Sequence, residues 1–147
     1  MKLSTKMRYG TRAMLELAFS YKRGPISLRE IADRQEISHK YLESLIAMLR
    51  AGGLVRSVRG AGGGHVLAKS PDQITLREVF ELLEGSEGLV DCTTNPDSCE
   101  KAGLCATQEV WAQMHGACMG VLESFTLEAL AHRAQEIERS QTVMYHI

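Results

Sequence analysis

Residues 27–51, SLREIADRQEISHKYLESLIAMLRA, predict two helices joined by a tight turn. Ser27 and Glu30 have the spacing of a capping box, in which the serine accepts a hydrogen bond from the third backbone N–H while the glutamate reaches back to the cap. A helix is therefore expected to begin at Leu28. It is short, because the segment Gln35-Glu36-Ile37 interrupts it after about two turns.

The second helix of this stretch is longer. Ser38 is placed to cap it, and the helical pattern continues to about Ala51. Its apolar side is formed by Tyr41, Leu42, Leu45, Ile46 and Leu49. A short helix, a tight turn and a longer helix with small polar and charged residues at its start are typical of a helix-turn-helix. In that motif the start of the second helix enters the major groove of DNA.

A glycine-rich segment separates two predicted strands after this helix. The strands cover residues 54–58 and 65–68, and Arg59-Gly-Ala-Gly-Gly-Gly64 lies between them. This pattern predicts a β-hairpin wing with an arginine at its base, placed for a minor groove. A phosphate-binding P-loop requires Lys followed by Ser or Thr, and then a helix, after its glycines. His65-Val66 and a strand follow here, so a nucleotide site is not expected.

Two more helices are expected to complete this domain. The first helix of the chain covers residues 4–21 and ends before Gly24-Pro25. Thr75 and Glu78 form a second capping box, ahead of a helix over residues 76–84. The apolar residues expected to pack this helix back on the winged domain are Val79, Leu82 and Leu83.

A longer helix is expected over residues 106–124. Apolar residues recur along it at spacings of three and four, as on a helix face that packs against a partner. They are Val110, Met114, Cys118, Val121, Leu122 and Phe125. Such a stripe beyond a finished domain predicts a dimer seam; the alternative is that it covers the first helix. Cys118, a lone helical cysteine, is expected to be a small buried hydrophobe. Thr126 is placed to cap a final helix to about Ile137.

Three cysteines lie between the winged domain and the long helix, at Cys92, Cys99 and Cys105. Pro96 and Gly103 indicate a loop, so the three thiols are expected to converge. Their spacing is more open than the paired Cys-x₂-Cys of a structural zinc site, and thiolates are the ligands of iron–sulfur clusters. A metal or an iron–sulfur cluster is therefore the favoured interpretation. A framework disulfide and free surface thiols are the alternatives.

Composition and charge are those of a globular protein with two different ends. The 147 residues are 44% hydrophobic and 24% charged, and no apolar run approaches the roughly 18 residues of a membrane span. Residues 1–67 hold 12 Lys and Arg against 5 Asp and Glu, whereas residues 68–147 hold 5 against 13. The front is basic and the rear acidic. Residues 1–19 carry charges and no apolar signal core, so a cytoplasmic protein without membrane contact is expected.

Several of these motifs together resemble one known family. The segments are residues 1–9 (MKLSTKMRY), residues 37–43 (ISHKYLE), residues 53–64 (GLVRSVRGAGGG) and the cysteine triplet. In this order they are similar to the IscR/NsrR family of iron–sulfur transcription regulators, over about residues 1–138. The resemblance implies a homodimeric bacterial winged-helix protein that binds a double-stranded DNA operator. It also implies a repressor or activator that senses cluster, redox or nitric oxide status.

The resemblance implies that Cys92, Cys99 and Cys105 hold the cluster. Relatives with a [2Fe–2S] cluster place a histidine three residues after the last cysteine, where this chain has Gln108. Relatives with a [4Fe–4S] cluster draw a carboxylate from the first helix of the partner, where this chain has Arg8. [2Fe–2S] is favoured over [4Fe–4S], and the fourth ligand stays open. Glutamine is a poor iron ligand, and neither expected fourth ligand is present. The remaining candidates are Glu109, His115, Glu16 or His39 of either subunit, or a thiol from solution.

The residues expected to contact DNA lie on the first helix, the helix-turn-helix and the wing. Positive charge for phosphates or a groove would come from Arg8, Lys40, Arg50, Arg56 and Arg59, and hydrogen bonds from Ser38, Tyr41 and Ser44. Glu43 is the informative residue, because a carboxylate that faces DNA can accept from the N4 amine of cytosine. The alternative is that Glu43 is solvated or pairs with Arg50 or Lys40 within its helix.

These expectations combine into one mainly α organisation. Residues 1–85 form a winged helix-turn-helix DNA-binding domain, residues 86–105 a cluster-binding loop, and residues 106–147 a helical dimerisation region. No nucleophile and base pair is visible, so we expect a transcription regulator, and specifically a repressor, with no small-molecule substrate and no enzymatic activity. The cluster is expected to tie the loop to the long helix and so set the spacing of the two recognition helices. The alternatives are a zinc-bound or clusterless thiol-redox regulator and, less favoured, an electron-transfer protein.

Overall fold

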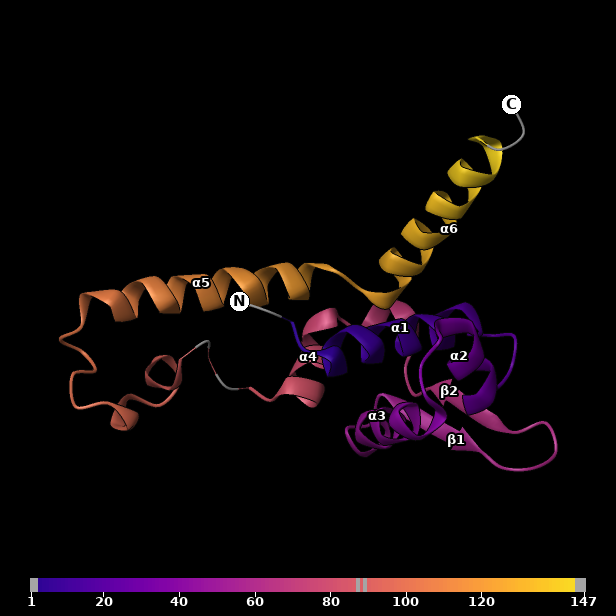
Figure 1. The fold of residues 1–147 in the computed structure, drawn as a ribbon, viewed down its shortest axis with the longest axis horizontal. Coiled ribbons are helices and arrows are strands. Elements are labelled where there is room, and N and C mark those ends of the chain that lie inside the picture. Colours follow the sequence, from indigo (N-terminus) through magenta and orange to yellow (C-terminus); the bar gives the residue numbers. More distant parts are fainter. Residues whose placement is uncertain (1–2, 87, 89, 145–147) are drawn as a thin grey trace.

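The computed structural model describes residues 3–86, 88 and 90–144, and it shows a winged helix-turn-helix with two further long helices (Figure 1). Its helices are α1 (Thr5–Phe19), α2 (Leu28–Gln35), α3 (His39–Ala51), α4 (Leu76–Glu84), α5 (Ala106–Ser124) and α6 (Leu127–Met144). β1 (Val55–Val58) and β2 (Gly64–Leu67) form an antiparallel hairpin, in which Val55 pairs with Leu67. The mainly helical fold with a small wing is confirmed.

Side-chain caps fix the first residues of both α2 and α3. Ser27 Oγ accepts from the backbone N–H of Glu30 at 3.2 Å, and Glu30 Oε2 accepts from the backbone N–H of Ser27 at 3.1 Å. These bonds complete the capping box. The backbone N–H and then the hydroxyl of Ser27, which both donate to the Glu30 carboxylate, lower the pKa of Glu30. Glu36 ends α2 in a left-handed conformation at φ 53°, and Ser38 Oγ then accepts from the backbone N–H of Tyr41 at 3.3 Å. The predicted caps are confirmed, and they define where α3 begins.

A buried carboxylate joins α1 to the end of α2. Glu16 is 6% exposed, and its two oxygens accept from Gln35 Nε2 at 2.5 Å and from Arg34 Nη1 at 3.1 Å. Arg12 holds the same glutamine from another side, because its guanidinium donates to the side-chain and the backbone oxygen of Gln35, each at 2.7 Å. A buried charge is tolerated when it has such partners. The network therefore fixes the residue directly before the turn into α3.

The core lies between α1, α3, α4 and the hairpin. Fully buried side chains come from every one of these elements, from α2 and from the segment before α4; they include Met14, Leu17, Ile31, Leu42, Leu45, Leu49, Val55, Ile74, Val79 and Leu83. On α3 the buried positions recur every three or four residues, so the opposite side of that helix faces solvent. Burial of one face thus gives α3 a fixed orientation on the domain.

The corner between α5 and α6 is attached to the winged domain by backbone pairing. Leu76 N–H donates to the carbonyl of Phe125, and Leu127 N–H donates to the carbonyl of Ile74, both at 2.9 Å. Leu127 is itself fully buried in the core of the winged domain. From this corner α5 and α6 extend beyond the domain in different directions (Figure 1).

Three features differ from the sequence expectation. α1 ends at Phe19, short of its expected end, and α6 continues to Met144 instead of stopping near Ile137. The last two turns of α6 contain no proline or glycine that would stop the helix. Two 3₁₀ helices, Asp91–Thr93 and Pro96–Ser98, occupy the predicted cysteine loop. Among the described residues, no helix is both long and apolar enough to cross a membrane.

Candidate nucleic-acid interface and cysteine loop

The solvent side of α3 carries most of the residues that the sequence assigned to DNA contact. Its exposed members are Ser38, Lys40, Glu43, Ser44 and Arg50, whereas Tyr41 is half-buried. Two hydroxyls are already bonded locally, because Ser38 Oγ caps the helix and Ser44 Oγ donates to the carbonyl of Tyr41 at 2.7 Å. Hydroxyls in such bonds can still contact a phosphate or base through their remaining donor or acceptor capacity.

Glu43 lies on this surface and forms no ion pair with any described residue. Within the described part of the chain, neither Lys40 nor Arg50 lies within 4.0 Å of its carboxylate. The predicted alternative of an intrahelical pair is therefore not formed. The carboxylate is exposed to solvent, where it can accept a hydrogen bond from an amine at a base edge.

Arg50 connects the end of α3 to the wing. Its Nη1 donates to Ser57 Oγ at 3.2 Å, and Ser57 Oγ lies 3.4 Å from Nδ1 of His65, the residue paired with Ser57 on the neighbouring strand. Arg56 and Arg59 are exposed on the wing, and neither forms an ion pair in the regions that the structure describes. These two guanidiniums are therefore free to meet phosphates or a groove.

Close backbone contacts explain the end of the glycine run. A Cβ at Gly63 would collide with the carbonyl oxygen of Val58, and a Cβ at Gly64 would collide with the carbonyl of Ile26. β2 approaches the segment before α2 here, where the backbones of Ile26 and His65 exchange hydrogen bonds of 3.1 and 2.8 Å. The glycines are thus required by the packing of the wing, in agreement with the rejection of a phosphate-binding loop.

Tyr9 joins α1 to α3, the predicted recognition helix. The sequence alone did not identify Tyr9 as a residue of this site. Its ring meets the ring of Tyr41 edge to face, with the centroids 6.1 Å apart. The guanidiniums of Arg8 and Arg12 lie 5.9 and 5.5 Å from the centroid of Tyr9. Arg8 is exposed, as a DNA contact must be, whereas the guanidinium of Arg12 donates hydrogen bonds to Gln35. The pairing depends on how α1 crosses α3, so no local pattern could have revealed it.

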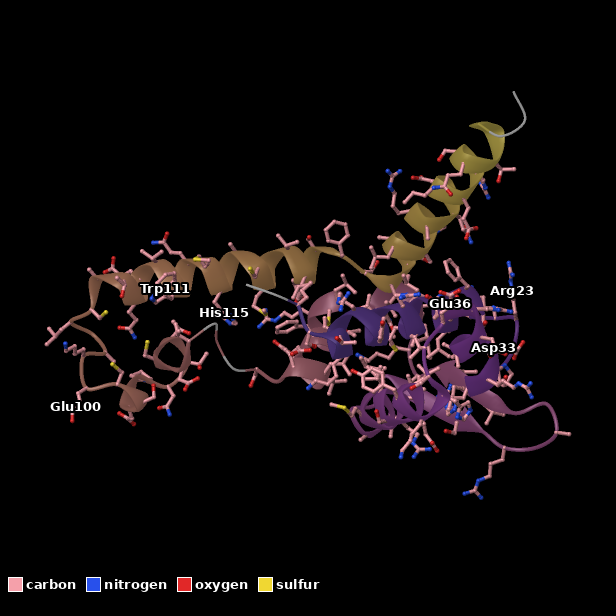
Figure 2. The ribbon with its side chains drawn as sticks, viewed as in Figure 1. Arg23, Asp33, Glu36, Glu100, Trp111 and His115 are labelled. Carbon is pink, nitrogen blue, oxygen red and sulfur yellow. The ribbon has the colours of Figure 1, made fainter. Side chains whose placement is uncertain are left out.

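The cysteine loop lies beside the start of α5, away from the winged domain (Figure 1). Cys92 and Cys105 are half-buried, Cys99 is exposed, and all four cysteines of the chain are free thiols. Figure 2 shows Glu100 on this loop and Trp111 on the neighbouring turns of α5. The loop follows α4 and precedes α5 in the chain, so both helices join it to the winged domain.

The three thiols do not converge within one chain, contrary to the sequence expectation. In the described residues, no three His, Cys, Asp or Glu side chains gather closely enough to hold a metal ion. The 3₁₀ helices Asp91–Thr93 and Pro96–Ser98, together with a left-handed Gly103 at φ 82°, fix the backbone between the cysteines. Binding of one centre by all three thiols would require this loop to close further.

Cys105 occupies the cap position of α5. Its Sγ lies 3.1 Å from Thr107 Oγ1, and this hydroxyl, followed by the nearby backbone N–H groups of Gln108 and Thr107, lowers the pKa of the Cys105 thiol. The thiolate is the form that binds metals, and a helix N-terminus favours it. The donor chemistry of the loop, three accessible thiols of which one is biased toward thiolate, therefore fits an iron–sulfur cluster or another thiophilic metal centre.

The candidate ligand Glu16, and Gln108 at the position where the resemblance implies a ligand, already form hydrogen bonds within the chain. The amide of Gln108 is bonded to the loop backbone through both its oxygen and its nitrogen, and the carboxylate of Glu16 is buried against Arg34 and Gln35. The other candidates are Glu109, exposed on α5, His115, half-buried on α5, and His39, exposed at the start of α3. Figure 2 shows His115 on the same helix as Trp111.

The apolar stripe of α5 is uncovered in one chain. No residue of this helix is buried, and its exposed large apolar residues are Val110, Trp111, Met114 and Val121, followed by Phe125 just beyond its end. The alternative in which the stripe covers α1 is therefore wrong. The expected burial of Cys118 is also not found, because this thiol lies on a helix that projects from the domain. A contiguous exposed apolar face of this kind marks an interaction surface.

His65 should make the stability of the wing pH-dependent. Burial, and next the charge of Arg50, lower the pKa of His65 below its ordinary value of 6.5. The unfolded chain then binds more protons than the folded chain just below pH 6.5, so the stabilisation is present above that pH and is lost as the pH falls through the folded pKa. We expect His65→Gln to show a shallower loss of unfolding free energy than wild type between pH 7.5 and 5.

Urea unfolding at several pH values in this window measures the difference. The control is His132→Gln, which changes an exposed histidine of α6 and should leave the pH profile of the wild type unchanged. Parallel profiles for wild type and His65→Gln would contradict the assignment.

The chain is similar to known proteins over most of its length. Residues 3–133 match the family model of Rrf2, described as an iron-dependent transcriptional regulator. The HTH-type transcriptional regulator CymR of Bacillus subtilis is 43% identical over 131 residues, which cover 89% of this chain and 90% of CymR. The structure of that CymR, the global cysteine regulator of B. subtilis, matches at a TM-score of 0.77 and 42% identity over 90% of this chain and 98% of the other. The structure of T. potens IscR matches at a TM-score of 0.81 and 40% identity over 99% and 96% of the two chains.

These matches agree with the site as described. The matched proteins are transcriptional regulators and not enzymes, which confirms the expected class and the resemblance to IscR. They extend across the winged domain, the cysteine loop and the long helix, so they are not limited to the DNA-binding motif. The chain belongs to the Rrf2 family of transcriptional regulators.

Proposed function

We propose that this Rrf2-family regulator binds its operator as a homodimer, and that an iron–sulfur cluster held by Cys92, Cys99 and Cys105 sets its affinity for DNA. The observation that carries the proposal is the placement of the cysteine loop. It is joined directly to the start of α5, while the other end of α5 is attached to the winged domain. A change in the loop can therefore act on a rigid helix that reaches the DNA-binding part of the chain.

Contacts at the C-terminal end of α5 support this connection between the cysteine loop and the winged domain. Arg77 on α4 lies 2.8 Å from Glu81 of the same helix and 3.8 Å from Glu123 in the last turn of α5. α4 in turn packs against both α1 and α3. A cluster on the three thiolates would supply an iron centre that responds to oxidants or nitric oxide. The residues of the chain would hold the loop, α5 and α4 in register with the recognition helix.

The uncovered face of α5 supports the homodimer. Apolar residues line this helix from Val110 to Phe125, and a second copy of the chain offers a matching surface. Recognition helices of a dimer must meet half-sites about one helical turn apart, or a multiple of it. A small shift of one α5 against the other would change this separation, and with it the affinity for a given operator. Repression would follow where the operator overlaps a promoter.

A clusterless or zinc-bound thiol regulator is the second candidate, and one observation favours it. The three thiols are free and separate in the described loop, and the pKa of Cys105 is lowered, as in cysteines that react with oxidants. Oxidation of such a thiol would alter the same loop and act on the same helix. Zinc would give no visible absorption, whereas an iron–sulfur cluster would.

The cluster is tested by the visible absorption spectrum of anaerobically purified protein, with iron and sulfide counted per chain. We expect a coloured protein whose absorption and iron are lost in Cys99→Ser, because a thiolate ligand is removed. Cys118→Ser is the matched control and should keep both, since Cys118 lies on α5 outside the loop. The ratio of iron to sulfide and the spectrum distinguish [2Fe–2S] from [4Fe–4S]. A colourless wild-type protein that contains zinc or no metal would contradict the proposal and favour the second candidate.

Glu43 is proposed to read a base pair of the operator. Replacement by alanine removes the carboxylate acceptor, so Glu43→Ala should lose discrimination of about 1–3 kcal/mol at one base pair. Operators selected from random DNA, and their single-base variants, provide the ligands for binding measurements at fixed salt. Glu36→Ala removes the same charge from the neighbouring turn and should leave discrimination unchanged. Equal base preferences for wild type and Glu43→Ala would show that this carboxylate does not read the sequence.

A further inference from the structure

One side chain in the first turn of α5 reaches back into the cysteine loop. Gln108 Nε2 donates to the carbonyl oxygen of Cys92 at 2.6 Å, and Gln108 Oε1 accepts from the backbone N–H of Gly103 at 2.8 Å. Its own backbone N–H donates to the carbonyl of Cys105 at 3.0 Å. The residue is half-buried and uses both ends of its amide. Gln108 thus contacts the backbone at or beside the first and the last thiol of the triplet.

The other side-chain hydrogen bonds of the described loop span six residues or fewer. Thr93 Oγ1 donates to the carbonyl of Val90, and Ser98 Oγ donates to the carbonyl of Asn95, in each case three residues away. The bond from Gln108 to Cys92 spans 16 residues. Closure of a long loop carries an entropic cost that such a bond must offset. Gln108 therefore connects parts of the loop that the local bonds leave independent.

We propose that Gln108 is a positioning residue that closes the cysteine loop on α5 without acting as a metal ligand. Its two hydrogen bonds hold the 3₁₀ helix Asp91–Thr93 against the start of α5, where Cys105 is the cap. The backbones that carry Cys92 and Cys105 are thereby kept at a fixed separation before any centre is bound. A histidine at this position could act as a ligand, whereas the glutamine of this chain gives a backbone clamp.

This clamp explains how the loop can be ordered while its thiols are free. With the ends of the loop held, fewer conformations have to be lost when all three thiols gather on one centre, so assembly should be faster than from an open loop. The part that concerns assembly rests on the proposed function. The closure itself does not, because it is made by hydrogen bonds of the chain alone.

Hydrogen exchange of residues 90–105 in chelator-treated, reduced protein tests the closure. Gln108→Ala removes both bonds and keeps α5 intact, because alanine is the best helix former. We expect the amide of Gly103 and the peptide around Cys92 to exchange roughly tenfold faster in this variant, as for the loss of bonds of ordinary strength that close a loop. Gln113→Ala changes an exposed glutamine of the same helix and should match wild type.

A second variant separates the two bonds. Gln108→Glu keeps an acceptor for the N–H of Gly103 and replaces the donor to Cys92 by a carboxylate oxygen. Exchange should therefore rise around Cys92 and stay slow at Gly103. Exchange rates in Gln108→Ala and Gln108→Glu that equal those of wild type throughout the loop would overturn the inference.

Cluster reconstitution keeps the two proposals distinguishable. If wild type binds iron and sulfide, Gln108→Ala should reach the same spectrum severalfold more slowly, and an unchanged rate would overturn the assembly part. If wild type binds no iron while the exchange difference persists, the clamp stands and the proposed cluster fails. If wild type binds iron but shows no exchange difference from Gln108→Ala, the cluster stands and the clamp fails.

Discussion

Backbone hydrogen bonds attach the corner between α5 and α6 to the segment before α4. Any coupling between the cysteine loop and α3 depends on this attachment. Ile74 and Leu76 bond to Leu127 and Phe125, and the side chain of Leu127 is buried in the core of the winged domain. The long helix is thus attached at one end to the domain that carries α3, and its other end carries the cysteines. Without this attachment, a chemical event in the loop would have no defined route to the recognition helix.

A second group of contacts holds the recognition helix from the other side. Glu16 and Arg12 on α1 grip Gln35 at the end of α2, and Tyr9 meets Tyr41 at the start of α3. The orientation of the solvent-exposed side of α3 is therefore set by residues that themselves face the protein. Arg56 and Arg59 on the wing and Glu43 on α3 are in contrast exposed and free of ion pairs in the described chain.

Much of the winged domain could be predicted from the sequence because its signals are local. The capping boxes at Ser27 and Thr75 lie within single turns, and the structure forms both. The glycine run and its flanking strands also specify a hairpin by short-range rules. The apolar stripe on α5 was identified for the same reason, since helical spacing shows a face that needs a cover. The sequence could not say that one chain would leave this face open.

The cysteine loop was predicted less well, because its geometry depends on distant contacts. The spacing of Cys92, Cys99 and Cys105 indicated shared ligation, yet the two 3₁₀ helices hold the loop backbone in a conformation with separate thiols. The amide of Gln108 joins the two ends of this loop. The sequence alone showed that Gln108 stands in the position of a ligand. It could not show that Gln108 bonds to a carbonyl 16 residues away. The attachment of Leu127 was missed for the same reason, since nothing near it in sequence names Ile74 as its partner.

We propose that the presence or absence of a cluster in the cysteine loop controls the affinity for DNA through α5. The most direct measurement is the binding of one operator fragment, at one salt concentration, by cluster-loaded protein and by the same preparation after anaerobic removal of iron. Salt must be fixed because phosphate contacts make affinity strongly salt-dependent. We expect the two affinities to differ by about 5- to 150-fold, the usual range of coupling between two sites. Equal affinities of the two forms would contradict it.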